Sequence, residues 1–103
     1  MTLSNQQKKQ FRAIGHTLKP VVTIAGKGTS PSVVKELERA ISDHELIKIK
    51  LVVGDRKERL SVLNEVNEIL GSVTVQQIGN MALIYLASDD ADPTLSNVMR
   101  FIA

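Results

Sequence analysis

The segment Pro20-Val21-Val22-Thr23-Ile24-Ala25-Gly26-Lys27-Gly28-Thr29-Ser30-Pro31 decides the fold class of this 103-residue chain. Residues 21–24 form a short apolar run of β-branched side chains, which predicts a strand buried on both faces. Ser30 followed by Pro31 predicts a helix start, because the serine hydroxyl caps the first turn and proline there has no amide to leave unpaired. A strand that leads through a glycine-rich turn into a helix is typical of layered α/β proteins.

Start and stop signals predict two helices around this strand. Upstream, Ser4 and Gln7 form a capping box, so a first helix begins near Asn5 and must end before Pro20. Downstream, the helix that starts at residues 30–31 continues to about residue 43.

A third helix is predicted between Asp55 and Gly71. Asp55 with Glu58 forms another capping box, and glycine commonly supplies the left-handed residue that closes a helix. Apolar side chains recur through this segment at helical spacing and give it the broadest apolar surface of the predicted helices.

Residues 46–53 predict a strand with two different faces. Ile47 and Ile49 fall on one face, while Lys48 and Lys50 fall on the other, because side chains alternate along a strand. The isoleucine face is expected in the core and the lysine face in solvent.

Two more strands, residues 73–78 and 81–86, are separated by Gly79 and Asn80, a two-residue hairpin signal. The predicted order is therefore α-β-α-β-α-β-β. Right-handed crossovers place the early strands parallel, and the hairpin adds an antiparallel pair. We expect an α/β fold with one four-stranded mixed sheet layered with helices.

A length of 103 residues predicts a single domain, which we place at residues 1–87. Residues 88–103 are expected to form an acidic linker and a short C-terminal helix or tail. After Pro93, apolar residues recur at helical spacing, namely Leu95, Val98, Met99 and Ile102. A helix docked on the domain and a frayed tail are both compatible with this pattern.

The composition excludes several classes of function. The chain has no cysteine, which rules out disulfides and thiolate metal sites and is compatible with the cytoplasm, where we expect the protein. Its apolar runs are too short for a membrane helix. His16 and His44 lack further metal ligands at a suitable spacing, so no metal or cofactor is expected. The sequence also lacks a nucleophile motif such as GxSxG, so an enzyme is not expected.

Positive charge is concentrated in the first half of the chain. Residues 1–50 contain nine basic and four acidic residues, and the first thirty contain five basic residues and no carboxylate. Such asymmetry indicates a polyanionic partner, although a solvated basic face is an alternative. Only Phe11, Tyr85 and Phe101 are aromatic, so an aromatic platform for stacking bases is not expected.

The glycine-rich turn, residues 25–30, lies where α/β proteins bind phosphate. It does not match a P-loop, because Lys27 is followed by Gly28 instead of serine or threonine. It does not match a dinucleotide-binding fingerprint, because Pro31 occupies the third glycine position. Two interpretations stay open: a turn that grips a nucleic-acid backbone, as the GXXG loop of KH domains does, and a plain strand-to-helix turn.

Four segments in order carry a family resemblance: residues 16–22 (HTLKPVV), the glycine-rich turn, residues 44–50 (HELIKIK), and residues 77–79 (QIG) before a strand that ends at Tyr85. Together they resemble the CRM domain, the chloroplast RNA splicing and ribosome maturation domain, and specifically the bacterial stand-alone YhbY-like proteins. The resemblance covers Leu3 to Tyr85.

This resemblance implies a fold similar to the carboxyl-terminal domain of bacterial translation initiation factor three. It also implies RNA binding and, for bacterial members, association with precursors of the large ribosomal subunit. The family's GXXG turn falls on residues 25–28, with Ala25 in place of its first glycine, and Leu86 stands where the family often has a basic residue.

The leading hypothesis is thus a monomeric RNA-binding protein that acts on ribosomal RNA in large-subunit assembly. The turn is expected to contact phosphate through Gly26, Lys27, Gly28 and Thr29. Basic side chains elsewhere are expected to enlarge the positive field, namely Lys8, Lys9, Arg12, Lys19, Lys48 and Lys50. The alternative is a protein-binding adaptor that uses the C-terminal apolar stripe. A nucleotide-dependent enzyme is disfavoured by the failed P-loop match.

Overall fold

A computed structural model describes residues 3–26 and 28–102 and confirms the predicted order of elements. The elements are α1 (Asn5–Gly15), β1 (Pro20–Ala25), α2 (Pro31–His44), β2 (Leu46–Val52), α3 (Arg56–Leu70), β3 (Val73–Ile78), β4 (Met81–Tyr85) and α4 (Met99–Ile102).

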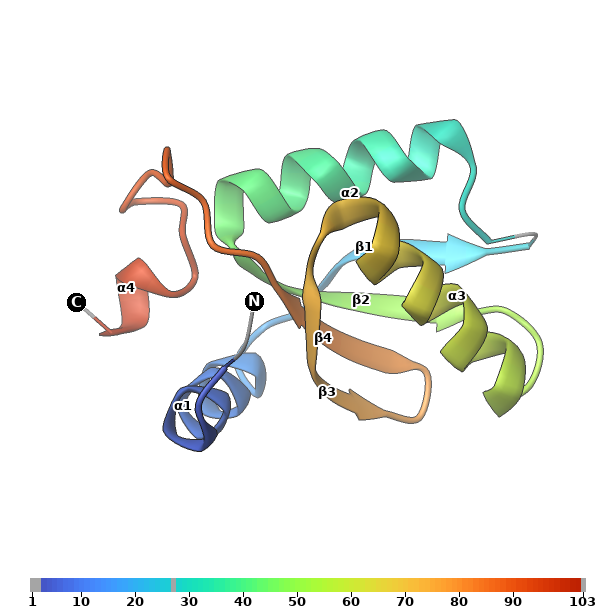
Figure 1. Ribbon diagram of the computed structural model, residues 1–103, viewed down its shortest axis with the longest axis horizontal. Helices are drawn as coiled ribbons and strands as arrows, with labels where there is room; N and C mark the ends of the chain where they lie inside the picture. Colours follow the sequence, from blue (N-terminus) through green and yellow to red (C-terminus); the bar gives the residue numbers. More distant parts are fainter. Residues whose placement is uncertain (1–2, 27, 103) are drawn as a thin grey trace.

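The four strands form one mixed sheet in the order β1-β2-β4-β3 (Figure 1). β1 and β2 are parallel and are joined through α2, whereas β4 is antiparallel to both β2 and β3. The predicted α/β class and the mixed four-stranded sheet are therefore confirmed.

Local capping explains where the helices begin. At α1 the hydroxyl of Ser4 accepts from the amide of Gln7 at 3.1 Å, and the Gln7 side chain accepts from the Ser4 amide at 2.9 Å. At α3 the Asp55 carboxylate accepts from the amide of Glu58 at 2.9 Å. Gly71 ends α3 with a φ of 73°, a conformation that favours glycine.

Helices cover the two faces of the sheet unequally. Figure 1 shows α2 above the sheet and α1 below it, toward one end, and α3 packs on the same face as α2 because both contribute to one core cluster. The upper layer buries the larger core cluster, in which Leu37, Ile41 and Val66 pack against strand residues such as Ile49. The lower layer is smaller and packs α1 against β2, β3 and β4.

The prediction that residues 21–24 are buried on both faces is wrong. Val22 and Ile24 are buried, but Val21 is 50% exposed and Thr23 is also exposed. The reason is the topology: β1 lies at the sheet edge, and α1 packs on β2 and β3 instead of on β1. Among the described residues, no helix consequently lies over part of the lower sheet face.

The C-terminal segment docks on the domain, but only part of its apolar stripe makes contact, since Val98 packs against the lower core. Ser96 and Asn97 are buried, whereas Leu95 and Met99 are exposed. Ser96 donates its hydroxyl to the carboxylate of Glu45 at 2.6 Å. The helical part of this segment is limited to α4.

Candidate nucleic-acid interface

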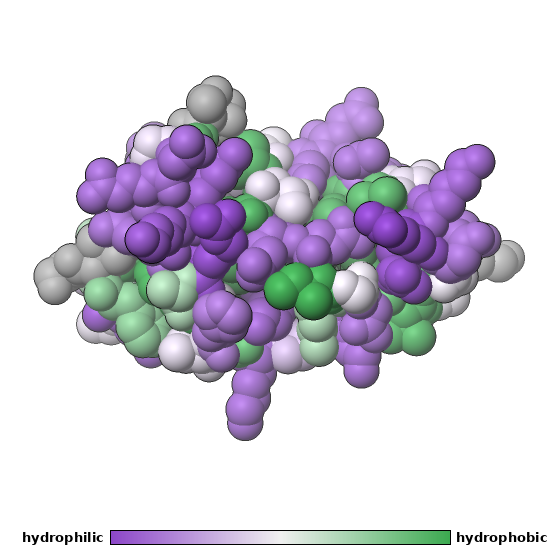
Figure 2. All heavy atoms as spheres, turned by 90° about the horizontal axis from the view of Figure 1, so that it is seen from below, coloured by the Kyte–Doolittle hydropathy of each residue, from purple (hydrophilic) through white to green (hydrophobic). Residues whose placement is uncertain are grey.

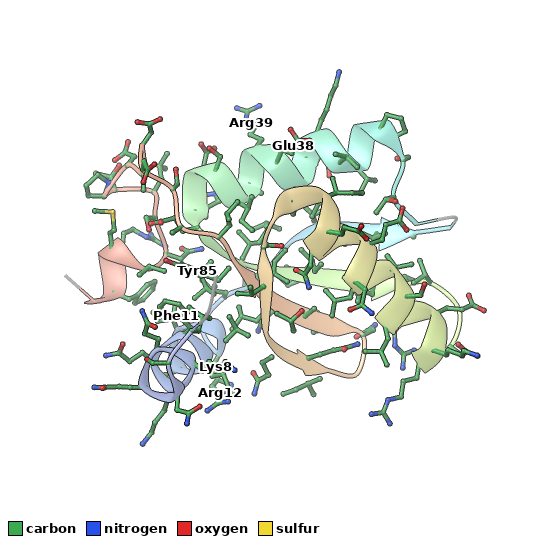
Figure 3. The ribbon with its side chains drawn as sticks, viewed as in Figure 1. Lys8, Phe11, Arg12, Glu38, Arg39 and Tyr85 are labelled. Atoms are coloured by element: carbon green, nitrogen blue, oxygen red, sulfur yellow. The ribbon has the colours of Figure 1, made fainter. Side chains whose placement is uncertain are left out.

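One row of basic side chains runs along α1. Lys8, Arg12 and His16 are spaced four residues apart, so they lie on the same side of the helix. Figure 3 shows Lys8 and Arg12 projecting from the side of α1 nearer the β3–β4 hairpin in this view. Lys9 is exposed but falls outside this row.

Two lysines of β2 lie on the sheet face that carries α1. Lys48 pairs in register with Pro20 of β1 and with Leu83 of β4, and Leu83 belongs to the core cluster under α1. Lys50 follows two residues later on the same face, beyond the cover of the helix. Both are partly buried, as expected if their stems lie on the sheet and their ammonium groups reach solvent.

These groups form one surface, which we call the basic face: Lys8, Arg12, His16, Lys19, Lys48 and Lys50. Lys19 joins it because it lines a shallow hollow together with Lys48. Figure 2, which views the molecule from below, shows mainly hydrophilic side chains with a few apolar ones between them. Five of the predicted basic site residues thus lie on the α1 side of the sheet, although they come from three separate segments: Lys8, Arg12, Lys19, Lys48 and Lys50.

The glycine-rich turn lies elsewhere. It follows the last residue of β1, at the sheet end where β2 also terminates and the β3–β4 turn begins (Figure 1). α1 lies toward the opposite end. Lys27, the predicted phosphate contact of this turn, falls outside the described residues.

The backbone of the turn explains its glycines. Gly26 has a φ of 66° and Gly28 a φ of 94°, both in the region that favours glycine. Ala25, by contrast, is the last residue of β1 and pairs with Val52. Alanine can replace the first glycine of the family's turn because this position is part of a strand.

Thr29 is already engaged within the protein. Its hydroxyl donates to the carboxylate of Glu65 on α3 at 2.6 Å. A phosphate oxygen needs a donor, and this hydroxyl has only one proton to give. The role of Thr29 in binding stays a prediction, which would require Glu65 to release it.

Replacing Gly28 by alanine is expected to lower the free energy of unfolding by about 1–2 kcal/mol. The cost comes from placing a Cβ at a positive φ, since the added atom would meet Val62 only at 3.5 Å, an ordinary contact distance. Chemical denaturation of the variant and the parent measures it. A loss below 0.3 kcal/mol, as for a neutral surface change, would contradict the conformation of this turn.

Two arginines at the turn end of the sheet were missed by the sequence reasoning. Arg56 and Arg59 of α3 line a hollow with Gln77 and Gly79. The buried Nε of Arg59 has no hydrogen-bond partner within the part of the chain that the structure describes. They were overlooked because they lie in the half of the chain in which acidic residues outnumber basic ones.

The aromatic rings are arranged mainly for packing. Phe11 is buried, and its ring lies 4.7 Å from that of Tyr85. Burial, assisted by the negative charge of Glu45, raises the pKa of Tyr85 above its usual value, so the phenol is neutral at pH 7. Phe101 is exposed on α4, where it lines a hollow with residues of α1 and lies beneath the guanidinium of Arg100. These positions agree with the expectation that no platform of stacked rings is presented.

Two further features concern metal binding and membrane insertion. Within residues 3–26 and 28–102, no three histidine or carboxylate side chains gather closely enough to hold a metal ion. No helix in the described part of the chain has the length and apolar character needed to span a membrane.

Comparison with known proteins places this chain in a family. The family model of the CRS1 / YhbY (CRM) domain matches residues 3–85. A Pseudomonas aeruginosa protein named "Probable RNA-binding protein PA4753" is 48% identical over 101 residues, covering 98% of this chain and 97% of the relative. A Haemophilus influenzae protein named "RNA-binding protein" is 36% identical over 90 residues, covering 87% of this chain and 91% of the relative.

A solved structure supports the same assignment. The solution structure of the hypothetical protein SAV1595 from Staphylococcus aureus superimposes with a TM-score of 0.75 at 26% identity. The match covers 86% of this chain and 93% of that one. Sequence, fold and curated relatives therefore agree, and the chain belongs to the CRS1/YhbY (CRM) domain family.

Proposed function

We propose that this protein binds structured RNA through the basic face. The observation that carries the proposal is that Lys48 and Lys50 lie on the sheet face that α1 covers only in part, while Lys8 and Arg12 project from the side of α1 nearer the β3–β4 hairpin (Figure 3). Phosphates held in a fixed array by a folded RNA can meet such a surface at several points at once. The relatives named as RNA-binding proteins support this reading.

We further propose that the RNA is ribosomal and that the protein acts, as a cytoplasmic monomer, on precursors of the large ribosomal subunit. The family resemblance supports ribosomal RNA as the target. The protein's contribution is binding, since the basic face provides charge and shape for an anionic partner. Cross-linking in growing cells followed by sequencing of the bound RNA identifies the target directly. Recovery of mainly messenger or transfer RNA would contradict a ribosomal target.

Binding is expected to weaken linearly, on logarithmic scales, as salt rises. If four to six basic groups each neutralise a phosphate, the slope is roughly −3 to −5, from about 0.7–0.9 per phosphate. Structured ribosomal RNA should compete better than polyuridine of equal length, because its phosphates are fixed in space. Titration of both labelled RNAs across a salt series measures both effects.

Either of two results would contradict this proposal. A flat salt response would mean that phosphate contacts do not dominate binding. A preference for polyuridine would mean that the recognition surface is not the basic face.

A protein-binding adaptor is the second candidate function, and one observation favours it. Leu95, Met99 and Phe101 are 42%, 38% and 49% exposed on the docked C-terminal segment. Exposed apolar side chains that lie together often mark an interaction surface. If the cross-linking experiment returns protein partners with an empty RNA fraction, this function replaces the first.

A further inference from the structure

An irregularity in β3 turns one polar side chain onto the lower sheet face. The register between β3 and β4 shifts between Thr74 and Gln76, so that Gln76 pairs with Leu83 and Gln77 with Ala82. Val75 is buried in the lower core with Leu83, and Gln76 lines a hollow on that same face. Two consecutive residues therefore share one face, as a β-bulge allows.

Without the bulge, strict alternation would direct Gln76 toward α3. The next residue shows the opposite orientation, since Gln77 lines the hollow beside Arg56 and Arg59 on the α3 side. Bulges often re-aim a side chain next to a functional site. This bulge brings a carboxamide to the edge of the basic face.

The hollow that receives Gln76 has a volume of about 200 Å³. Its apolar wall is formed by Ile78, Met81 and Leu83, and His16 and Lys48 also line it. Ile78 is 62% exposed, which is unusual for a large aliphatic side chain in a strand. The hollow begins where the row of Lys8, Arg12 and His16 ends.

We propose that this hollow binds one unstacked nucleobase of the RNA. The proposal rests on the proposed function and adds to it a point of base recognition that phosphate contacts cannot supply. Proteins that read RNA sequence usually take bases that are splayed out of a helix and hydrogen-bond to their edges.

The chemistry of the hollow fits a base better than it fits a phosphate or an apolar side chain. The aliphatic wall can cover the face of a ring, whereas a phosphate would leave it exposed to water. The Gln76 carboxamide both donates and accepts hydrogen bonds, which matches the mixed edge of a base. The volume is below the 300 Å³ at which drug-sized ligand pockets begin, so it suits a single ring system.

The surrounding charges fit the same ligand. A flipped-out nucleotide carries a phosphate on each side of its sugar. Arg12 on α1 lies along the row that leads into the hollow, and Lys48 lies on its rim. Both cations can therefore hold the flanking backbone while the base enters.

The test uses hairpin RNAs that differ at one unpaired position. One hairpin carries a base there, a second carries an abasic nucleotide, and a third carries 2-aminopurine. The parent protein is expected to bind the base-containing RNA about tenfold more tightly than the abasic RNA. The 2-aminopurine fluorescence should rise on binding, because the base leaves its stacked neighbours and meets no aromatic ring.

Gln76→Met is the decisive variant, because methionine keeps the length and the apolar stem but removes the hydrogen-bonding amide. It should reduce the tenfold preference for the base-containing RNA over the abasic RNA and leave the salt slope unchanged. The matched control is Gln77→Met, the neighbouring residue on the opposite sheet face, which should retain discrimination. Thermal unfolding of both variants shows whether each is folded.

The outcomes separate this inference from the function on which it rests. If the parent binds all the RNAs with the expected salt slope but does not distinguish the abasic hairpin, the base site is wrong and RNA binding stands. Equal discrimination by Gln76→Met and the parent also overturns the role of the amide. If the parent binds none of the RNAs, the proposed function itself fails.

Discussion

Replacing Lys48 and Lys50 together by glutamate is expected to lower affinity for structured RNA by about 100-fold. Hydrogen bonds to charged groups contribute about 1.5–3 kcal/mol each, so the loss of two amounts to at least about 3 kcal/mol. Repulsion between the new carboxylates and phosphate adds to this loss. Filter binding at one fixed salt concentration measures it.

The fold should tolerate this change, because both side chains are only partly buried and their charged ends reach solvent. The matched control reverses Lys35 and Arg39, two exposed residues of α2 that alter net charge equally. Figure 3 shows Arg39 on the side of α2 that faces away from the sheet. This control should weaken binding by only a few-fold.

Equal losses in the two double variants would mean that net charge, and not the basic face, governs binding. Full affinity in the Lys48 and Lys50 variant would exclude the uncovered sheet face and leave α1 or the glycine-rich turn as the RNA surface. Thermal unfolding of both variants guards against a loss of affinity caused by misfolding.

The order of elements could be predicted because each boundary has a local chemical cause. Ser4, Ser30 and Asp55 each accept from an amide in the first turn of their helix, as their sequence contexts predict. The hairpin at Gly79 and the alternation in β2 depend equally on neighbouring residues. Local signals of this kind survive in the folded protein because tertiary packing agrees with them.

The exposure of β1 could not be predicted in the same way. Val21 and Thr23 belong to an apolar, β-branched run, and that run has the same appearance in a central strand and at an edge. Only the placement of α1 over β2 and β3 decides that one side of β1 is open. The bulge at Gln76 depends likewise on pairing with β4, which no short window of sequence reveals.

The candidate site, like the fold, could be predicted from the sequence only in part. The sequence identified Lys8, Arg12, Lys48 and Lys50 as basic, and the alternation in β2 placed its two lysines on one face. That this face is the one under α1 depends on the handedness of the crossovers. His16 could have been found earlier, because its spacing of four residues from Arg12 continues the row.

The attachment of the C-terminal segment centres on an unusual residue. Glu45 follows α2 with a φ of 61°, a conformation that favours glycine and costs other residues about 1–3 kcal/mol. Its buried carboxylate accepts from the hydroxyl of Ser96 at 2.6 Å and from the amide of Ser88 at 2.8 Å. Asn97 adds a bond from its side chain to the carbonyl of Leu46 at 2.7 Å.

These contacts explain why a glutamate occupies a glycine-like position. A buried carboxylate is costly unless hydrogen-bond donors stabilise its charge. The C-terminal segment supplies one side-chain hydroxyl and one backbone amide as donors. His44 reinforces the attachment, since its Nδ1 lies 2.8 Å from the carbonyl of Leu95 and must donate to it. The segment is thus held mainly by polar bonds, while Leu95, Met99 and Phe101 are left exposed.

Ser96→Ala is therefore expected to lower the free energy of unfolding by about 2–3 kcal/mol, because the buried carboxylate of Glu45 loses a charge-assisted bond. For a domain of this size the melting temperature should fall by roughly 10–20 °C. The Asn97 amide, which donates to the carbonyl of His44 at 2.8 Å, should exchange faster with solvent.

Ser88→Ala is the matched control: it keeps the backbone amide that Glu45 binds and should change stability by less than about 0.5 kcal/mol. If the two variants unfold at the same temperature, the bond between Glu45 and Ser96 does not hold the segment, and docking must depend on Asn97 and on the packing of Val98 against the lower core.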